Sequence, residues 1–183
     1  RLGSMPMWKW SARVANVLFR EGIVGECVLV IPDGEKKALE SNFFEIPLRF
    51  ASGGMERVDS VLSGLREASG KMVFVHDAAR PFVSINLCRR LFFAAGEGGA
   101  VPVLPETDAL KRISKTGEVM SVSREGLFRT QTPQVFPRHL LLSVLERAER
   151  GVKDEAEAWI AAGMPLATVP GEQKNFKITY EED

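Results

Sequence analysis

Short continuous runs of apolar residues alternate along the chain with stretches in which apolar residues recur every three or four positions. The clearest runs are Cys27–Ile31 and Val73–Val75, and such runs are typical of strands buried on both faces. Residues 58–65 have apolar side chains at positions i, i+3, i+4 and i+7, which predicts a helix with one apolar face. Strand and helix therefore alternate.

The same patterns predict the remaining elements. Further helices are expected at about 7–22, 35–40, 84–95, 137–151 and 154–163, and further strands at 47–50, 98–103, 166–169 and 175–179. The regular alternation up to residue 103 predicts an α/β fold with a Rossmann-like, doubly wound and mostly parallel sheet.

Residues 104–136 depart from this alternation. Leu110–Ile113 and Glu118–Val122 flank a glycine-containing loop, which is typical of a β-hairpin. No helix is expected to cover this hairpin, and an isolated hairpin is only marginally stable in water. We therefore expect one domain over residues 1–183, with a projecting arm at about 104–130 that another surface, such as a second subunit, stabilises.

Composition excludes several function classes. The 24 Lys and Arg residues balance the 24 Asp and Glu residues, which argues against a nucleic-acid or membrane-surface binder, since these carry a basic excess. No apolar run approaches the roughly 20 residues of a membrane span. The two cysteines have no metal-ligand spacing and there are only two histidines, so we expect no zinc site and a reduced, cytoplasmic protein.

Candidate chemistry is concentrated where the strand at 73–75 ends. His76 and Asp77 follow directly, then two alanines, Arg80 and a proline that stops the strand. Ligands of open α/β sheets bind outside the carboxyl ends of strands, and a carboxylate three residues from a guanidinium can hold a metal ion and a phosphate together. The alternative is a plain strand end with a capping aspartate and a solvated arginine.

Other polar residues fall at predicted turns and strand ends. They are Gly53, Gly54, Arg57, Ser60, Arg124, Thr132 and Lys177. The set is rich in cations and hydroxyls but has no convincing general base, and no Walker A, Gly-x-Ser-x-Gly or Gly-x-Gly-x-x-Gly motif is present. A phosphorylated substrate fits best, with Asp77 as a magnesium ligand. A phosphate nucleophile is mostly dianionic near neutral pH, so alignment and charge neutralisation matter more than proton abstraction.

Four motifs that occur in a fixed order carry a family resemblance. They are Gly53-Gly54-x-x-Arg57-x-x-Ser60-Val61-x-x-Gly64-Leu65, Val75-His76-Asp77-Ala78-Ala79-Arg80-Pro81, Gln131-Thr132-Pro133-Gln134-x-Phe136 and Asn175-Phe176-Lys177-Ile178-Thr179. From about Met7 to Asp183 the chain resembles the 2-C-methyl-D-erythritol 4-phosphate cytidylyltransferases of the non-mevalonate isoprenoid pathway. Ribitol-5-phosphate cytidylyltransferases share much of the pattern and remain an alternative.

The resemblance implies attack of methylerythritol phosphate on the α-phosphorus of CTP, with Mg²⁺ or another divalent cation at Asp77. The implied CTP-binding residues are Gly53, Gly54, Ser60, Asp77 and Ala78. The implied sugar-phosphate-binding residues are Arg80, Arg124, Thr132 and Lys177, and the implied catalytic residues are Arg1, Asp77 and Lys177. The hairpin corresponds to the family's dimerisation arm, from which Arg124 would reach the partner's site in a homodimer.

The beginning of the chain departs from the family pattern. The family opens with a strand and a glycine-rich loop, Ala-Ala-Gly-x-Gly-x-Arg-x-Gly, followed by Pro-Lys-Gln. Only Arg1-Leu2-Gly3 corresponds to the end of this loop, and the lysine is absent. We expect that a segment between about Ser4 and Met5 is omitted. The alternatives are a cloning scar at Gly3-Ser4-Met5 and a degenerate nucleotide-binding homologue.

Three further departures concern substrate affinity more than reaction type. Met55, Ala109 and Lys153 stand where the family often has Asp, Thr and Thr. The pattern also calls for one more helix after Asp183, and the chain could equally be the amino-terminal half of a bifunctional enzyme.

Overall fold

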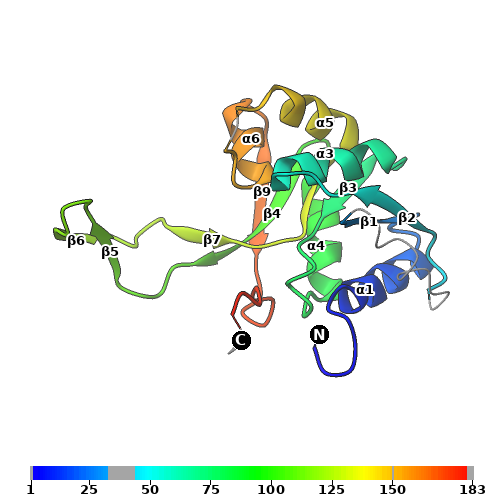
Figure 1. The fold of residues 1–183 in the computed structure, drawn as a ribbon, viewed down its shortest axis with the longest axis horizontal. Helices are drawn as coiled ribbons and strands as arrows, with labels where there is room; N and C mark the ends of the chain where they lie inside the picture. Colours follow the sequence, from blue (N-terminus) through cyan, green and yellow to red (C-terminus); the bar gives the residue numbers. More distant parts are fainter. Residues whose placement is uncertain (1, 33–43, 150, 181–183) are drawn as a thin grey trace.

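The computed structural model describes residues 2–32, 44–149 and 151–180 (Figure 1). The helices are α1 (Trp8–Arg20), α3 (Arg57–Glu67), α4 (Ile85–Ala95), α5 (Arg138–Arg147) and α6 (Glu155–Ala161). The strands are β1 (Cys27–Ile31), β2 (Leu48–Ser52), β3 (Met72–Val75), β4 (Gly99–Pro105), β5 (Leu110–Ile113), β6 (Val119–Val122), β7 (Phe128–Thr130), β8 (Gln134–Pro137) and β9 (Leu166–Pro170). The expected helix at 35–40 lies outside the described residues. None of the described helices is long and apolar enough to cross a membrane.

The strands form three sheets, and the largest of them is mixed. β4 pairs in parallel with β9 along one edge and antiparallel with β7 and β8 along the other, while β3 pairs antiparallel with β8. β1 and β2 form a parallel pair, and β5 and β6 form the predicted hairpin. The α/β prediction is confirmed, but a mostly parallel arrangement is wrong for the largest sheet. β8 runs antiparallel because the chain returns from the arm without a crossover helix, which a parallel connection needs.

A bulge separates β7 from β8 along their shared edge of β4. Val103 of β4 pairs with Thr130, and Ala100 of β4 pairs with Val135. Three residue steps along β4 therefore lie opposite five residue steps along the chain from β7 to β8. The two extra residues interrupt the ladder, and bulges of this kind re-aim side chains. Thr132 lies in this bulge, and its side chain contacts the end of β3.

Two apolar cores lie on opposite faces of the largest sheet. On one face, Val135 of β8 packs with Leu87 and Leu91 of α4. On the other face, the next residue, Phe136, packs with Trp159 of α6 at a ring-centroid distance of 5.0 Å, beneath α3 and α5. Successive strand residues point to opposite faces, so β8 supplies the centre of both cores. The molecule is therefore layered, with helices on each side of the sheet (Figure 1).

Residues 175–179 do not form the strand that their sequence predicts. The segment is tied to the loop after β3 by a backbone hydrogen bond from Ile178 N–H to the Ala79 carbonyl, at 2.8 Å. Asn175 is fully buried, and its Nδ2 donates to the Thr132 carbonyl at 2.9 Å. The segment is therefore a loop that packs on the rest of the molecule, and its apolar residues do not belong to a strand of a sheet.

β1 and β3 do not pair with each other, and a cavity of about 890 Å³ lies between them. It is lined mainly by apolar side chains of these two strands and of α1 and α3, and its lining also includes Arg57, Ser60 and Asp77. The β1–β2 sheet is therefore joined to the rest of the described chain without a shared strand ladder.

The contact between β4 and β8 gives a test of the core packing. A Cβ on Gly99 would lie 2.6 Å from Cδ1 of Phe136, which is fully buried and already packs on Trp159. We expect Gly99→Ala to lower the free energy of unfolding by about 1–3 kcal/mol, because an overpacked core is strained. Denaturant unfolding measures this change.

Gly25→Ala is the matched control. No atom lies within 4 Å of a Cβ built on Gly25, so its free energy of unfolding should stay within about 0.5 kcal/mol of the wild type. Equal midpoints for the two variants would contradict the packing described for β4 and β8.

Candidate active site

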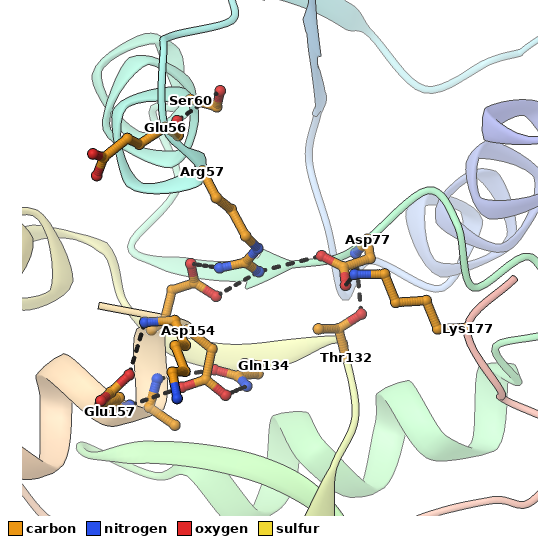
Figure 2. A network of polar contacts seen from close by, with 12 residues as sticks. Glu56, Arg57, Ser60, Asp77, Thr132, Gln134, Asp154, Glu157 and Lys177 are labelled. Carbon is orange, nitrogen blue, oxygen red and sulfur yellow. Dashed lines mark hydrogen bonds and ion pairs between the residues drawn. The ribbon is translucent and has the colours of Figure 1, made fainter. Parts of the chain in front are cut away.

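Charged and polar side chains from four parts of the chain converge where β3 ends (Figure 2). They come from the start of α3, the residues after β3, the bulge between β7 and β8, and the loop after β9. A further set at the start of α6 closes the network from the other side. Asp77 lies at its centre.

Asp77 is held between two cations. Its Oδ1 is 3.2 Å from Nη2 of Arg57, and its Oδ2 is 3.3 Å from Nζ of Lys177 (Figure 2). Burial by itself would raise the pKa of the Asp77 carboxyl, but the charges of Arg57 and Lys177 outweigh burial and lower it below its usual range. Asp77 is therefore a carboxylate near neutral pH.

A chain of hydrogen bonds joins the bulge to the residues after β3. The Asp77 N–H donates to Oγ1 of Thr132 at 3.0 Å, and Oγ1 lies 3.0 Å from Nδ1 of His76. Nε2 of His76 lies 3.1 Å from the Arg80 carbonyl oxygen. Because a carbonyl can only accept, the imidazole proton is on Nε2, and Nδ1 accepts from the threonine hydroxyl.

His76 is therefore neutral in the folded protein. Burial is the main cause and lowers its pKa to about 4. Both ring nitrogens already have partners within the chain. His76 acts as a hydrogen-bonding link between the Thr132 side chain and the loop after β3, which leaves it no free nitrogen for a reacting group.

Arg57 is held by Glu155 on the side away from Asp77. Nη1 and Nη2 of Arg57 lie 2.5 and 3.0 Å from Oε1 and Oε2 of Glu155, whose side chain is fully buried. Burial by itself would lower the pKa of the Arg57 guanidinium, but the two adjacent carboxylates outweigh burial and raise this pKa. Burial raises the pKa of Glu155, and the bidentate contact with Arg57 opposes that rise.

Gln134 of β8 fixes the start of α6. Its Nε2 donates to Oδ2 of Asp154 at 3.1 Å, and its Oε1 accepts from the Ala156 N–H at 3.1 Å. Asp154 also caps the helix, accepting from the Glu157 N–H at 2.8 Å. The helix end that carries Glu155 is thus anchored to the central strand of the sheet.

The glycine turn before α3 is closed by Ser60. The Gly54 N–H donates to Oγ of Ser60 at 3.0 Å, and that hydroxyl donates to the Glu56 carbonyl at 3.3 Å. A Cβ on Gly54 would overlap the Cβ of Asp59. Only glycine therefore allows this close approach of the turn to the helix.

Arg80 and Ala78 complete the loop after β3. Nη1 of Arg80 donates to the Asn175 carbonyl at 2.9 Å, whereas its buried Nε makes no hydrogen bond within the described part of the chain. Burial lowers the pKa of Arg80. Ala78 is exposed and lines the same cavity as Ser60, so its small side chain leaves the approach to Asp77 open.

The structure thus brings several predicted site residues together and leaves others apart. Asp77, Thr132 and Lys177 are in direct contact, and Gly53 and Gly54 adjoin Ser60 in the turn before α3. Arg124 is not among them. It lies exposed on the arm, where its guanidinium donates to the Thr107 carbonyl. Arg1 lies outside the described residues.

Arg57 is one of the predicted candidate residues but has no assigned role, and Glu155 is not predicted at all, although both belong to this network. Arg57 stands in the first sequence motif, which was a usable signal, but Glu155 is 98 positions further along the chain. Among the described residues no group of three or more His, Cys, Asp or Glu side chains could hold a metal ion. A divalent cation at Asp77 would therefore rely on oxygens of a bound ligand.

Comparison with known proteins gives consistent matches. The family model for 2-C-methyl-D-erythritol 4-phosphate cytidylyltransferase (IspD) matches residues 4–183. The chain is 40% identical over 181 residues to a bifunctional enzyme IspD/IspF of Anaeromyxobacter dehalogenans, covering 93% of this chain and 47% of that protein. It is 36% identical over 170 residues to a 2-C-methyl-D-erythritol 4-phosphate cytidylyltransferase of Nitrosomonas eutropha, covering 86% of this chain and 72% of that one.

A solved structure agrees with these matches. The crystal structure of 2-C-methyl-D-erythritol 4-phosphate cytidylyltransferase from Thermus thermophilus has a TM-score of 0.84 at 34% identity, covering 100% of this chain and 87% of that one. The chain spans about half the length of the bifunctional relatives that it matches, 47% for the Anaeromyxobacter dehalogenans protein.

The neutral His76 predicts a pH-dependent stability. Its pKa is about 4 in the folded protein against 6.5 for the free side chain, so between these values the unfolded chain binds more protons. The free energy of unfolding should be constant above about pH 6.5 and fall as the pH decreases toward 4. At about 1.4 kcal/mol per pKa unit the total loss is roughly 3 kcal/mol. Denaturant unfolding over this range measures it.

His76→Asn should flatten this dependence, whereas His139→Asn, at an exposed position, should keep it. Asp77 does not obscure the comparison, because its pKa lies below 3.8 and its contribution is lost only at lower pH. A His76→Asn variant with the wild-type slope would show that another group titrates in this range.

Proposed function

The chain belongs to the 2-C-methyl-D-erythritol 4-phosphate cytidylyltransferase (IspD) family, and we propose that it transfers the cytidylyl group of CTP to 2-C-methyl-D-erythritol 4-phosphate. The products are 4-diphosphocytidyl-2-C-methyl-D-erythritol and pyrophosphate, in the non-mevalonate isoprenoid pathway. The observation that carries this proposal is the ionised Asp77 at the end of β3, held between Arg57 and Lys177.

The chemistry of the network suits a phosphate nucleophile. A phosphate oxygen of the sugar phosphate forms a bond to the α-phosphorus of CTP, and the bond from that phosphorus to the bridging oxygen breaks, so that pyrophosphate leaves. The nucleophile is already mostly dianionic near neutral pH and needs no base. This agrees with a neutral His76 whose ring nitrogens are both engaged. Lys177 and Arg80 would offset the negative charge of the reacting phosphates.

We propose Mg²⁺ as the cofactor and Asp77 as its protein ligand. The donor set fits, because Mg²⁺ commonly takes one or two carboxylates together with substrate phosphates and water. When bound, the ion would neutralise charge on the triphosphate. The role of this chain toward the ion would be to hold the Asp77 carboxylate in a fixed orientation.

The remaining roles follow the family pattern. The nucleotide would lie against Gly53, Gly54, Ser60, Asp77 and Ala78, and the sugar phosphate against Arg80, Arg124, Thr132 and Lys177. The buried Nε of Arg80 supports the second assignment, because it makes no hydrogen bond within the described chain and an unpaired buried donor is costly until an acceptor arrives. Arg1 is proposed as catalytic from the family pattern alone.

We propose that the arm at 104–130 forms a homodimer and brings Arg124 into the partner's site. The arm extends well away from the rest of the molecule (Figure 1). It exposes large apolar side chains, with Ile113 68%, Val119 61% and Phe128 56% accessible. Such residues on a two-stranded hairpin favour burial against another surface. A cytoplasmic location is part of the proposal, since Cys27 and Cys88 are both free thiols.

The reaction itself can be tested with Asp77→Asn. Wild-type protein with CTP, Mg²⁺ and 2-C-methyl-D-erythritol 4-phosphate should release pyrophosphate, and the variant should lose on the order of 10²-fold or more in kcat. Glu97→Gln, at an exposed position after α4, is the control and should keep wild-type kcat. Pyrophosphate release with ribitol 5-phosphate but not with 2-C-methyl-D-erythritol 4-phosphate would refute the substrate assignment. No pyrophosphate release with either sugar phosphate would refute the proposed activity.

The role of the arm can be tested with Arg124→Ala. We expect kcat/KM for the sugar phosphate to fall by about 30-fold or more, because losing an Arg–phosphate pair in a desolvated site costs roughly 2–5 kcal/mol. KM for CTP should change little, and Arg112→Ala on β5 should resemble the wild type. Mixed dimers of Arg124→Ala and Asp77→Ala subunits should regain activity, and confirmed mixed dimers without it would contradict a shared site.

A further inference from the structure

We infer that Arg57, held in place by Glu155, is a positioning residue that fixes the orientation of the Asp77 carboxylate in the proposed cytidylyl-transfer site. The inference rests on the proposed function and adds two residues for which that function gives no role. It starts from the way in which one guanidinium is shared between two carboxylates (Figure 2).

Arg57 divides its donors unequally. Glu155 receives both terminal nitrogens, at 2.5 and 3.0 Å, whereas Asp77 receives only Nη2, at 3.2 Å. A free arginine beside Asp77 would be able to pair with it through both nitrogens, because the fork matches a carboxylate. Glu155 prevents this, so Asp77 is oriented by one N–H of the shared Nη2 group and keeps acceptor capacity on both oxygens.

The position of Arg57 is fixed from the core of the molecule. Glu155 is fully buried at the first residue of α6, and Gln134 of β8 bonds to the residues on either side of it, Asp154 and Ala156. A continuous series of contacts therefore runs from the central strand through α6 and α3 to Asp77. Arg57 cannot swing away without leaving the Glu155 charge buried and unpaired.

Stability alone is a poor explanation for this arrangement. Taking a carboxylate and a guanidinium out of water is costly, and well-packed apolar residues of similar size often stabilise a fold at least as well. The pair has no net charge, although Arg57, the member that contacts Asp77, also helps to keep that carboxyl ionised. What the pair supplies is a fixed direction for the Asp77 carboxylate, and changes to groups that orient a site residue commonly reduce activity or metal affinity by about 10- to 100-fold.

The test uses paired removal of both charges. Arg57→Met alone would leave the Glu155 charge buried and unpaired and so would destabilise the fold. The variant to measure is therefore the double substitution. Arg57→Met/Glu155→Leu removes both charges and keeps similar volume, and we expect its unfolding midpoint to lie close to the wild-type value. Its kcat should nevertheless be about 10- to 100-fold low, with KM for the sugar phosphate little changed.

Binding gives a readout that does not depend on turnover. We expect the affinity for CTP with Mn²⁺, measured by titration calorimetry, to fall by about 10-fold in the double variant. Arg57→Lys, which keeps the charge but not the fork, should recover part of both kcat and affinity. The control is Arg66→Met/Glu146→Leu, which removes an exposed ion pair between α3 and α5 and should match the wild type.

A double variant with wild-type kcat and wild-type affinity would overturn the inference, since the pair would then be only structural. If the double variant does not fold, kcat and CTP affinity are measured for Glu155→Gln and Arg57→Lys. Reduced kcat and affinity in these variants support the inference, and wild-type kcat and affinity overturn it. A wild type that binds CTP with Mn²⁺ but releases no pyrophosphate refutes the proposed function separately, and the affinity comparison still decides the role of Arg57.

Discussion

The position of β8 between β3 and β4 is the constraint on which the rest of the described structure depends. Two consecutive residues of this short strand, Val135 and Phe136, supply the centres of the cores on the two faces of the sheet. The residue before them, Gln134, fixes the start of α6. Two positions earlier, Thr132 bonds to the end of β3. Packing and site geometry therefore share one segment, and a shift in its register would disturb both.

The site built on this strand contains charged groups whose states are set before any ligand arrives. Asp77 is kept ionised by neighbouring cations, and His76 is kept neutral by burial and by hydrogen bonds at both ring nitrogens. His76, whose usual pKa of 6.5 is near neutrality, is thus moved out of that range. Such preorganisation suits a reaction in which charge must be balanced and phosphates aligned, and in which no side chain has to accept a proton.

Local sequence pattern was sufficient for the features that depend on neighbouring residues. Continuous apolar runs predict β1 and β3, and the polar residues after the second run predict Asp77 as a candidate that the structure places at the centre of the polar network. The direction of β8 could not be read in this way, because it depends on how the chain returns from the arm. The strand predicted at 175–179 is wrong, since a loop that packs on the rest of the molecule can carry the same apolar residues as a strand. The ion pair of Arg57 and Glu155 had no local signal, because a contact across 98 positions exists only after folding.

The separation of β1 from β3 determines which contacts hold the two sides of the candidate site together. The glycine turn at Gly53 and Gly54 follows β2, whereas Asp77 follows β3, so the two sides of the site belong to different sheets. Among the described strands no ladder of backbone hydrogen bonds spans the cavity between them. Within the described residues the two sides are joined by the packing of α3 on α5 and by the contacts of Arg57 with Asp77 and Glu155. Arg57 therefore does more than orient one carboxylate, because it also ties the helix that follows the glycine turn to α6 and to the residues after β3.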